Sequence, residues 1–136
     1  MKSKRESGAA AVEFALVLPF FLLVFSMIVD LSLAFYDKAV ITNASREAAR
    51  AGVVLRSPKL SSTDLQAIVT QYCDRYLIAF GGPSPVTTTS TGAGGAFGSS
   101  LTVNVSYRYT GLGWGALLGV VMGPFNLSAR TIMVHE

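Results

Sequence analysis

The feature that most constrains this chain is an uncharged run of sixteen residues, FALVLPFFLLVFSMIV, at Phe14–Val29. As an α-helix this run covers about 24 Å, which is less than the roughly 30 Å hydrocarbon core of a bilayer. A membrane span must therefore also use residues 9–12 on one side or residues 30–36 on the other. Glu13 and Asp30 then lie near the two boundaries of the apolar layer.

Three interpretations of this run compete. A buried core helix is one, although the run is more apolar than most such helices. A secretory signal peptide is another, because a basic start precedes the run and a small-x-small site follows at Ser32–Ala34. The third is a retained single-pass anchor, which we favour because Asp30 lies close to the would-be cut and the run is long for a signal. We therefore predict a transmembrane helix over residues 9–36.

Positive charge is concentrated at the N-terminus. The chain carries a formal net charge of +3, and Lys2, Lys4 and Arg5 against Glu6 supply +2 of it. This placement is a membrane-orientation signal and not a phosphate-binding face. We expect a cytoplasmic N-terminus, a periplasmic or otherwise extracytoplasmic C-terminal domain, and no nucleic-acid partner.

The chain offers few groups for catalysis or metal binding. Cys73 is its one cysteine and His135 its one histidine, and the carboxylates are scattered singly. One cysteine excludes an intramolecular disulfide and any multi-cysteine metal site. We expect no enzyme activity, no catalytic residue, no metal and no cofactor.

The junction before the apolar run reads SGAAAVEF, from Ser7 to Phe14. An acidic residue within an apolar stretch costs about 2.5–3.5 kcal/mol at mid-membrane and less near the edge. Glu13 either has a partner or marks the cytoplasmic edge, where water reaches it. The partner cannot come from the same span, because the next basic residue is Lys38. The residues alone leave both interpretations open.

Two motifs together carry a family resemblance. Gly8, four small or apolar residues, Glu13-Phe14 and a long apolar helix resemble the processing site of type IV prepilins. The short basic leader with Glu-Phe is similar to that of the tight-adherence (Tad, or Flp) pilus. Residues 41–52, ITNASREAARAG, resemble the TNAAREGARA signature of TadE-like pseudopilins, with Ser45 and Ala48 where the family often has Ala and Gly.

This resemblance, closest over residues 8–54, implies a processing step and a subunit contact. A prepilin peptidase would cut between Gly8 and Ala9, where a glycine leaves the backbone unhindered. The cut would free an α-amine whose ordinary pKa of about 8 makes it cationic at neutral pH. Glu13 of a neighbouring subunit would pair with that amine and, with Phe14, set the register between subunits.

The resemblance also implies a place in the cell and a set of partners. The place is the bacterial inner (cytoplasmic) membrane, with possible association with the pilus. The partners are the prepilin peptidase, other Tad pseudopilins or the pilin, inner-membrane platform proteins and the lipid bilayer. Whether the protein enters the fibre or stays in the membrane is left open.

Beyond the membrane the helical pattern continues to Leu55, and Pro58 ends it. We predict an extracytoplasmic stalk over residues 37–57. Its alanines and Gly52 permit close helix approach, although alanine is also simply the best helix former. We assign helix docking to four residues of the family motif, Asn43, Arg46, Glu47 and Arg50. The charged residues among them also fit a solvated face with local ion pairs.

The C-terminal part is predicted to be a small α+β head, residues 58–136. Ser61 and Asp64 form a capping-box pattern, which predicts the start of a second helix. Apolar residues at helical spacing indicate that this helix continues until Gly81 ends it. Cys73 lies beside that stripe, where it is a small buried hydrophobe or else a free or intermolecular thiol. Residues 81–100 are rich in Gly, Ser and Thr and are expected to be a mobile surface loop.

Two strands are expected after that loop. Leu101–Tyr109 alternates apolar and polar residues, and a second strand is expected over Asn126–His135. The apolar, glycine-rich residues 111–125 between them are too short and interrupted for a good second span. The candidates there for contact with the membrane or a partner are Trp114, Leu117, Leu118 and Val121, with neighbouring apolar residues.

The sequence as a whole predicts an α+β fold: a basic leader (1–8), a transmembrane helix (9–36), a stalk (37–57) and a head with an antiparallel sheet or hairpin. The function that the resemblance implies is that of a pseudopilin-like structural subunit required for Tad/Flp pilus biogenesis, and hence for adherence and surface attachment. The alternative is an extracytoplasmic binding domain, held by a signal peptide or a single-pass anchor and unrelated to pili.

Overall fold

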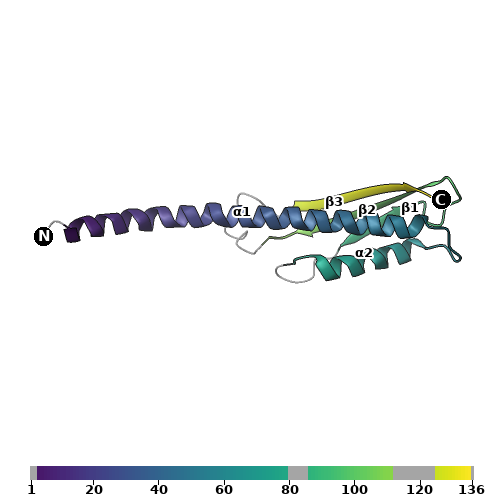
Figure 1. Ribbon diagram of the computed structural model, residues 1–136, viewed down its shortest axis with the longest axis horizontal. Coiled ribbons are helices and arrows are strands. Elements are labelled where there is room, and N and C mark those ends of the chain that lie inside the picture. Colours follow the sequence, from purple (N-terminus) through teal and green to yellow (C-terminus); the bar gives the residue numbers. More distant parts are fainter. Residues whose placement is uncertain (1–2, 80–85, 112–124, 136) are drawn as a thin grey trace. The chain divides into compact units, whose positions relative to one another are not determined.

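The computed structural model describes residues 3–79, 86–111 and 125–135, with side chains from Gly8 onward (Figure 1). Over these described ranges two helices precede three strands, which confirms the predicted α+β class. The chain divides into two compact units, Met1–Ser32 and Leu33–Glu136. Each unit is described by itself.

The first unit is helical from Ser3, where α1 (Ser3–Val53) begins. The helix continues through Pro19, which removes one backbone hydrogen bond and is tolerated in apolar helices. The hydroxyls of Ser26 and Ser32 donate to the carbonyls of Leu22 and Ile28, each at 2.8 Å. These bonds satisfy the hydroxyls inside the helix itself, so they need no water.

In the second unit, α2 (Ser62–Tyr76) begins with the predicted capping box. The Ser61 hydroxyl accepts from the Asp64 N–H, and the Asp64 carboxylate accepts from the Ser61 N–H at 2.8 Å. The helix ends at Tyr76, earlier than the expected stop at Gly81, because Leu77 has an extended backbone and its N–H closes the last turn on Cys73. The start of the helix was thus predictable from its cap.

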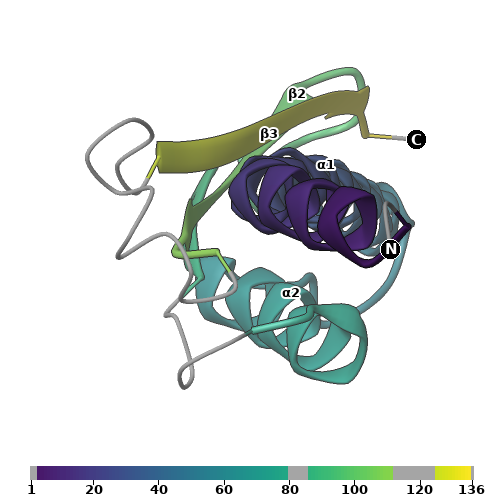
Figure 2. The same ribbon diagram turned by 90° about the vertical axis from the view of Figure 1, so that its left-hand side faces the viewer.

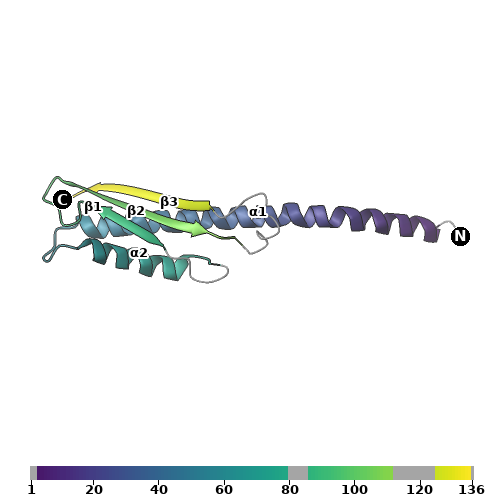
Figure 3. The ribbon, with the colours of Figure 1, turned by 180° about the vertical axis from the view of Figure 1, so that it is seen from behind.

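The sheet has three antiparallel strands in the order β1-β2-β3: β1 (Thr87–Thr91), β2 (Ser100–Tyr109) and β3 (Phe125–Val134). Its central pairing sets Ser100 opposite Val134 and Tyr109 opposite Phe125. The two predicted strands are confirmed within one residue. Figure 2 shows both helices of this unit on one face of the sheet, and Figure 3 shows the molecule from behind.

The prediction of an uninterrupted loop over residues 81–100 is wrong, because Thr87–Thr91 form β1. This stretch, TTTST, has no apolar residue and so lacks the usual strand pattern. Its β-branched threonines nevertheless suit extended backbone, and β1 pairs with β2 over its whole length. Gly92 has φ 85°, and a Cβ there would overlap the Ser100 carbonyl oxygen, so only glycine fits this turn.

The core of the second unit is built around the C-terminal part of α1. Alternate residues of β2 are buried, from Leu101 to Tyr109, and pack against α1 and α2. The buried positions on the two helices are Ala34, Ile41, Ala44, Ala48, Ala49, Leu65, Val69 and Cys73. Residues 37–53 of the expected stalk are therefore the central helix of this unit.

At Gly52, α1 lies close to both β2 and α2. A Cβ on Gly52 would lie 2.5 Å from Leu101 Cδ2 and 3.0 Å from Leu65 Cδ2. Both leucines are fully buried. Small residues on this face of α1 thus serve packing within the second unit, Leu33–Glu136, which is called the head from here on.

Candidate functional site along the N-terminal helix

The expected processing junction lies on an exposed part of α1. Gly8 and Ala9 are both helical and exposed. A Cβ added to Gly8 would meet nothing within 4 Å, so packing does not require a glycine there. Because glycine in a helix interior costs up to about 1 kcal/mol relative to alanine, Gly8 weakens the helix locally. A peptidase that needs an extended backbone would therefore have less helix stability to overcome at Gly8 than at an alanine.

Glu13 and Phe14 lie one turn further along α1, and both are exposed. Among the residues whose side chains the structure describes, Glu13 has no ion-pair partner. An acidic group in an apolar segment is costly unless it is paired or reaches water. The described part of the chain therefore leaves Glu13 available to a cation from outside.

Between Glu13 and Asp30, the first unit is apolar on all sides of the helix. Its large apolar side chains are exposed from Val12 through Ile28, including all four phenylalanines of Phe14–Val29. A helix that is apolar all round needs to be covered, by lipid or by protein. By length and composition alone, one described helix is long and apolar enough to cross a membrane.

The family-motif residues divide between the surface and its edge. Asn43, Arg46 and Arg50 are exposed on α1, and Glu47 is half-buried. Arg50 Nη2 lies 3.3 Å from Glu47 Oε1, an exposed pair within one helix turn. Such a surface pair contributes at most about 1 kcal/mol. The expected local ion pair is thus present, whereas Arg46 makes no ion pair with any residue that the structure describes.

The side chains between the exposed motif residues point into the head. Ser45 is fully buried, and its hydroxyl lies 2.7 Å from Thr131 Oγ1 on β3. Ala44 and Ala48 are also fully buried. The motif therefore has two faces, one that folds the head and one that is left for contacts.

Sequence reasoning missed Asp37. It is 0% exposed, and its Oδ1 accepts the Ile78 N–H at 3.2 Å. Its Oδ2 is buried and has no hydrogen-bond partner among the described residues. Asp37 joins α1 to the segment that follows α2. Helical spacing gives a signal for it, because it continues the buried stripe of Ala34, Ile41, Ala44 and Ala48.

Lys38 was also missed, and it contacts an outer strand of the described sheet. Its ammonium donates to the Ser128 carbonyl of β3. In the described strand order β3 is an outer strand, and an outer strand is where another chain can pair. A lysine beside such a strand disfavours that pairing.

Cys73 is buried on α2, as the interpretation of a small hydrophobe predicted. Burial raises the pKa of its thiol to about 11, with Asp74 and Asp37 adding to the effect. Such a thiol is unreactive at neutral pH.

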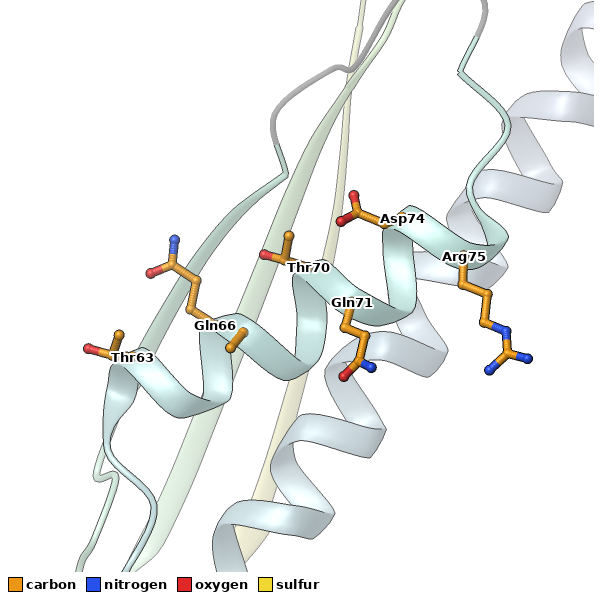
Figure 4. A pocket seen from close by; sticks show the side chains of 7 residues that line it. Thr63, Gln66, Thr70, Gln71, Asp74 and Arg75 are labelled. Carbon is orange, nitrogen blue, oxygen red and sulfur yellow. The ribbon is translucent and has the colours of Figure 1, made fainter.

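A shallow depression runs along the outer face of α2 (Figure 4). Every described residue that lines it comes from this one helix, and the labelled side chains fan out to both sides of it: Thr63, Gln66, Thr70, Gln71, Asp74 and Arg75. They do not converge on a point where a ligand would be held. The predicted contact residues Trp114, Leu117, Leu118 and Val121 lie outside the described residues.

A small helix-and-sheet unit that follows a long, exposed, apolar helix defines an α+β protein whose N-terminal helix has the length and composition of a membrane anchor. Residues 8–50 match the model of the family described as TadE-like protein. The match confirms the family resemblance, and it indicates a protein related to the Tad pilus. Searches of curated proteins and of solved structures found no match.

Proposed function

We propose that this protein is a pseudopilin-like structural subunit for biogenesis of the Tad/Flp pilus, and not an enzyme. The observation that carries the proposal is the match over residues 8–50, which contains both the Gly8–Ala9 junction and Glu13. The exposed apolar surface of the first unit supports it, because a subunit that works by docking must present its helix to lipid or to other helices.

In this proposal a prepilin peptidase cuts between Gly8 and Ala9. Mass spectrometry of the native protein, from cells with and without the peptidase, tests the step directly. We expect residues 1–8 to be absent only when the peptidase is present. A mature protein that still begins at Met1 in cells with a working peptidase would refute the assignment and leave the plain anchored domain.

Gly8→Val sharpens this test. The structure leaves open space around Gly8, so the variant should fold normally, while its branched side chain would hinder the scissile bond. Ala10→Val is the matched control, because it introduces the same side chain at an exposed position just past the cut. We expect the cut to be lost in Gly8→Val and kept in Ala10→Val.

The secretory alternative makes a different prediction, a mature N-terminus at Phe35. That cut would remove Ala34, which is buried in the core of the head. Loss of a packed core residue destabilises a small domain. This is a physical reason to prefer the prepilin cut, and the same mass measurement distinguishes the two.

The second step of the proposal pairs Glu13 with the new α-amine of a neighbouring subunit. Two charges that are each costly in lipid become tolerable as a pair, so the pair favours one register over others. We expect Glu13→Gln and Glu13→Leu to be cut normally but to assemble few pili, counted by electron microscopy. Asp74→Asn is the control, because it neutralises an exposed carboxylate on α2, away from the N-terminal helix and its family motif. Normal piliation in both Glu13 variants would refute the pairing.

The outward face of the motif supports docking to other Tad components. Asn43, Arg46 and Arg50 are exposed, and Arg46 makes no ion pair with a described residue. Charge reversal in Arg46→Glu should reduce co-purification with other pseudopilins or the inner-membrane platform proteins. Arg56→Glu, an exposed arginine beyond the end of α1, is the matched control.

A further inference from the structure

One end of the second unit gathers residues from three elements. The Tyr36 hydroxyl on α1 donates to the carbonyl of Tyr76 at the end of α2, at 3.1 Å. The Ile78 N–H donates to the Asp37 carboxylate at 3.2 Å. These two bonds place Tyr76 and Ile78 beside the part of α1 with which the unit begins.

Strand β3 starts at the same end. Lys38 contacts Ser128, and Ser45 contacts Thr131, so α1 and β3 advance in the same direction. Phe125, three residues before Ser128, therefore lies toward the beginning of the unit. Its ring is 5.4 Å from that of Tyr109, its partner across the sheet.

The side chains at this end form an exposed apolar group, which we name the collar. Its members, with their exposed fractions, are Phe35 (67%), Tyr36 (45%), Tyr76 (43%), Ile78 (37%) and Phe125 (41%). The Arg75 guanidinium lies 5.7 Å from the centre of the Tyr76 ring. Aromatic rings with polar tips, accompanied by cations on long stems, are the residues that proteins place at the lipid–water interface.

The chain length fixes how far the collar can be from the apolar run. Phe35 is six residues beyond Val29, so even a fully extended chain separates them by no more than about 22 Å. The headgroup layer on each side of a bilayer is about 5–8 Å thick. If residues 14–29 lie in the hydrocarbon, the linking chain is short enough to let the α1 part of the collar contact the headgroups, although it does not by itself place it there.

We propose that the collar is a lipid-binding surface and that the bilayer interface is its partner, which seats this end of the head on the membrane. The inference rests on the proposed anchoring of the N-terminal helix. Arg75 and Lys38 complement the charge of lipid phosphates, and the rings bury their apolar parts below them. The head is then positioned by its own contacts with lipid as well as by the helix.

The test measures depth in the membrane with the full chain in phosphatidylcholine–phosphatidylglycerol vesicles. Single cysteines at Ile78→Cys and Phe125→Cys carry a fluorophore, and quenching by lipids with a nitroxide on the headgroup or on the acyl chain is recorded. The native Cys73 does not interfere, because it is buried. The two positions lie on different segments, so a folding defect in one variant leaves the other informative.

Two further labels serve as controls. Phe97→Cys reports the opposite end of the unit, because its neighbour Gly98 donates to the carbonyl of His135, which follows β3. Leu22→Cys reports insertion of the apolar run. We expect the headgroup nitroxide to reduce fluorescence at positions 78 and 125 and not at 97, with the acyl nitroxide acting at 22.

The other outcomes each overturn the inference in a recognisable way. Quenching at 22 with none at 78 or 125 leaves the anchor intact and refutes the collar. No quenching at 22 refutes the anchor and the collar together. Energy transfer between labels on separate copies at 125, without quenching by lipid, assigns the surface to a second copy of the chain instead.

Discussion

The close approach at Gly52 leads to a prediction in which two opposing effects can be weighed. Replacing glycine by alanine gains at most about 1 kcal/mol from helix propensity, because Gly52 lies in the last turn of α1. In this structure the new Cβ would lie 2.5 Å from Leu101 Cδ2 and 3.0 Å from Leu65 Cδ2, and both leucines are fully buried. Overpacking of a core costs about 1–3 kcal/mol. We expect Gly52→Ala to destabilise the head by about 1 kcal/mol in net terms.

The assay is denaturant unfolding of the full chain in detergent, followed by near-ultraviolet circular dichroism of the buried tyrosines. Ala51→Gly, at the adjacent half-buried position, calibrates the propensity effect. Leu101→Val removes the clashing Cδ2 carbon, so it should lower the free energy of unfolding less in the double variant with Gly52→Ala than in the otherwise native chain. Stabilisation by Gly52→Ala, or strict additivity of the two changes, would show that the space is open and the packing argument mistaken.

Three further predictions concern polar and titratable groups of the head. Asp37→Ala should lower the free energy of unfolding of the head by about 1–3 kcal/mol, whereas Asp37→Asn should lower it less, because asparagine keeps an acceptor for the Ile78 N–H. Equal losses for the two variants in unfolding experiments would exclude the Asp37–Ile78 hydrogen bond as the cause. The hydrogen bonds from Ser61 lower the pKa of Asp64, so the ionised carboxylate stabilises the fold at neutral pH, and this stabilisation is lost as the pH falls below the ordinary pKa of an aspartate. The difference in melting temperature between the native chain and Asp64→Ala should therefore shrink in acid. A difference that stays constant with pH would contradict this. Burial raises the pKa of Cys73 to about 11, whereas the thiol of the unfolded chain ionises near pH 9, so the free energy of unfolding should fall as the pH rises from about 9 to about 11. A maleimide should label Cys73 at pH 8 only after the protein is unfolded. Rapid labelling of the folded protein would refute its burial.

Elements with a strong local signal were predictable from the sequence. The capping residues Ser61 and Asp64 placed the start of α2, and the alternation from Leu101 to Tyr109 placed β2. The apolar run and the family motif identified α1 and the relationship to TadE-like proteins. In each case neighbouring residues alone carry the information.

Features that depend on distant partners were not predictable in the same way. Strand β1 has only threonines and a serine, and its pairing with β2 is what makes it a strand. The small residues of α1 suit contact with any helix, and nothing in their spacing says that the chain's own sheet covers them. Asp37 gave a signal in its spacing, but a lone carboxylate on an apolar stripe would usually be taken as a surface residue.

The central position of α1 in the head has a practical consequence for anyone preparing the head without its apolar run. Deleting the chain up to residue 50, where the family match ends, would remove Ile41, Ala44 and Ala48, which pack against β2. The inner face of the sheet would then be exposed to water. Such a fragment should aggregate. A shortened protein for work in solution should instead begin near Leu33, so that the helix that fills the sheet is retained.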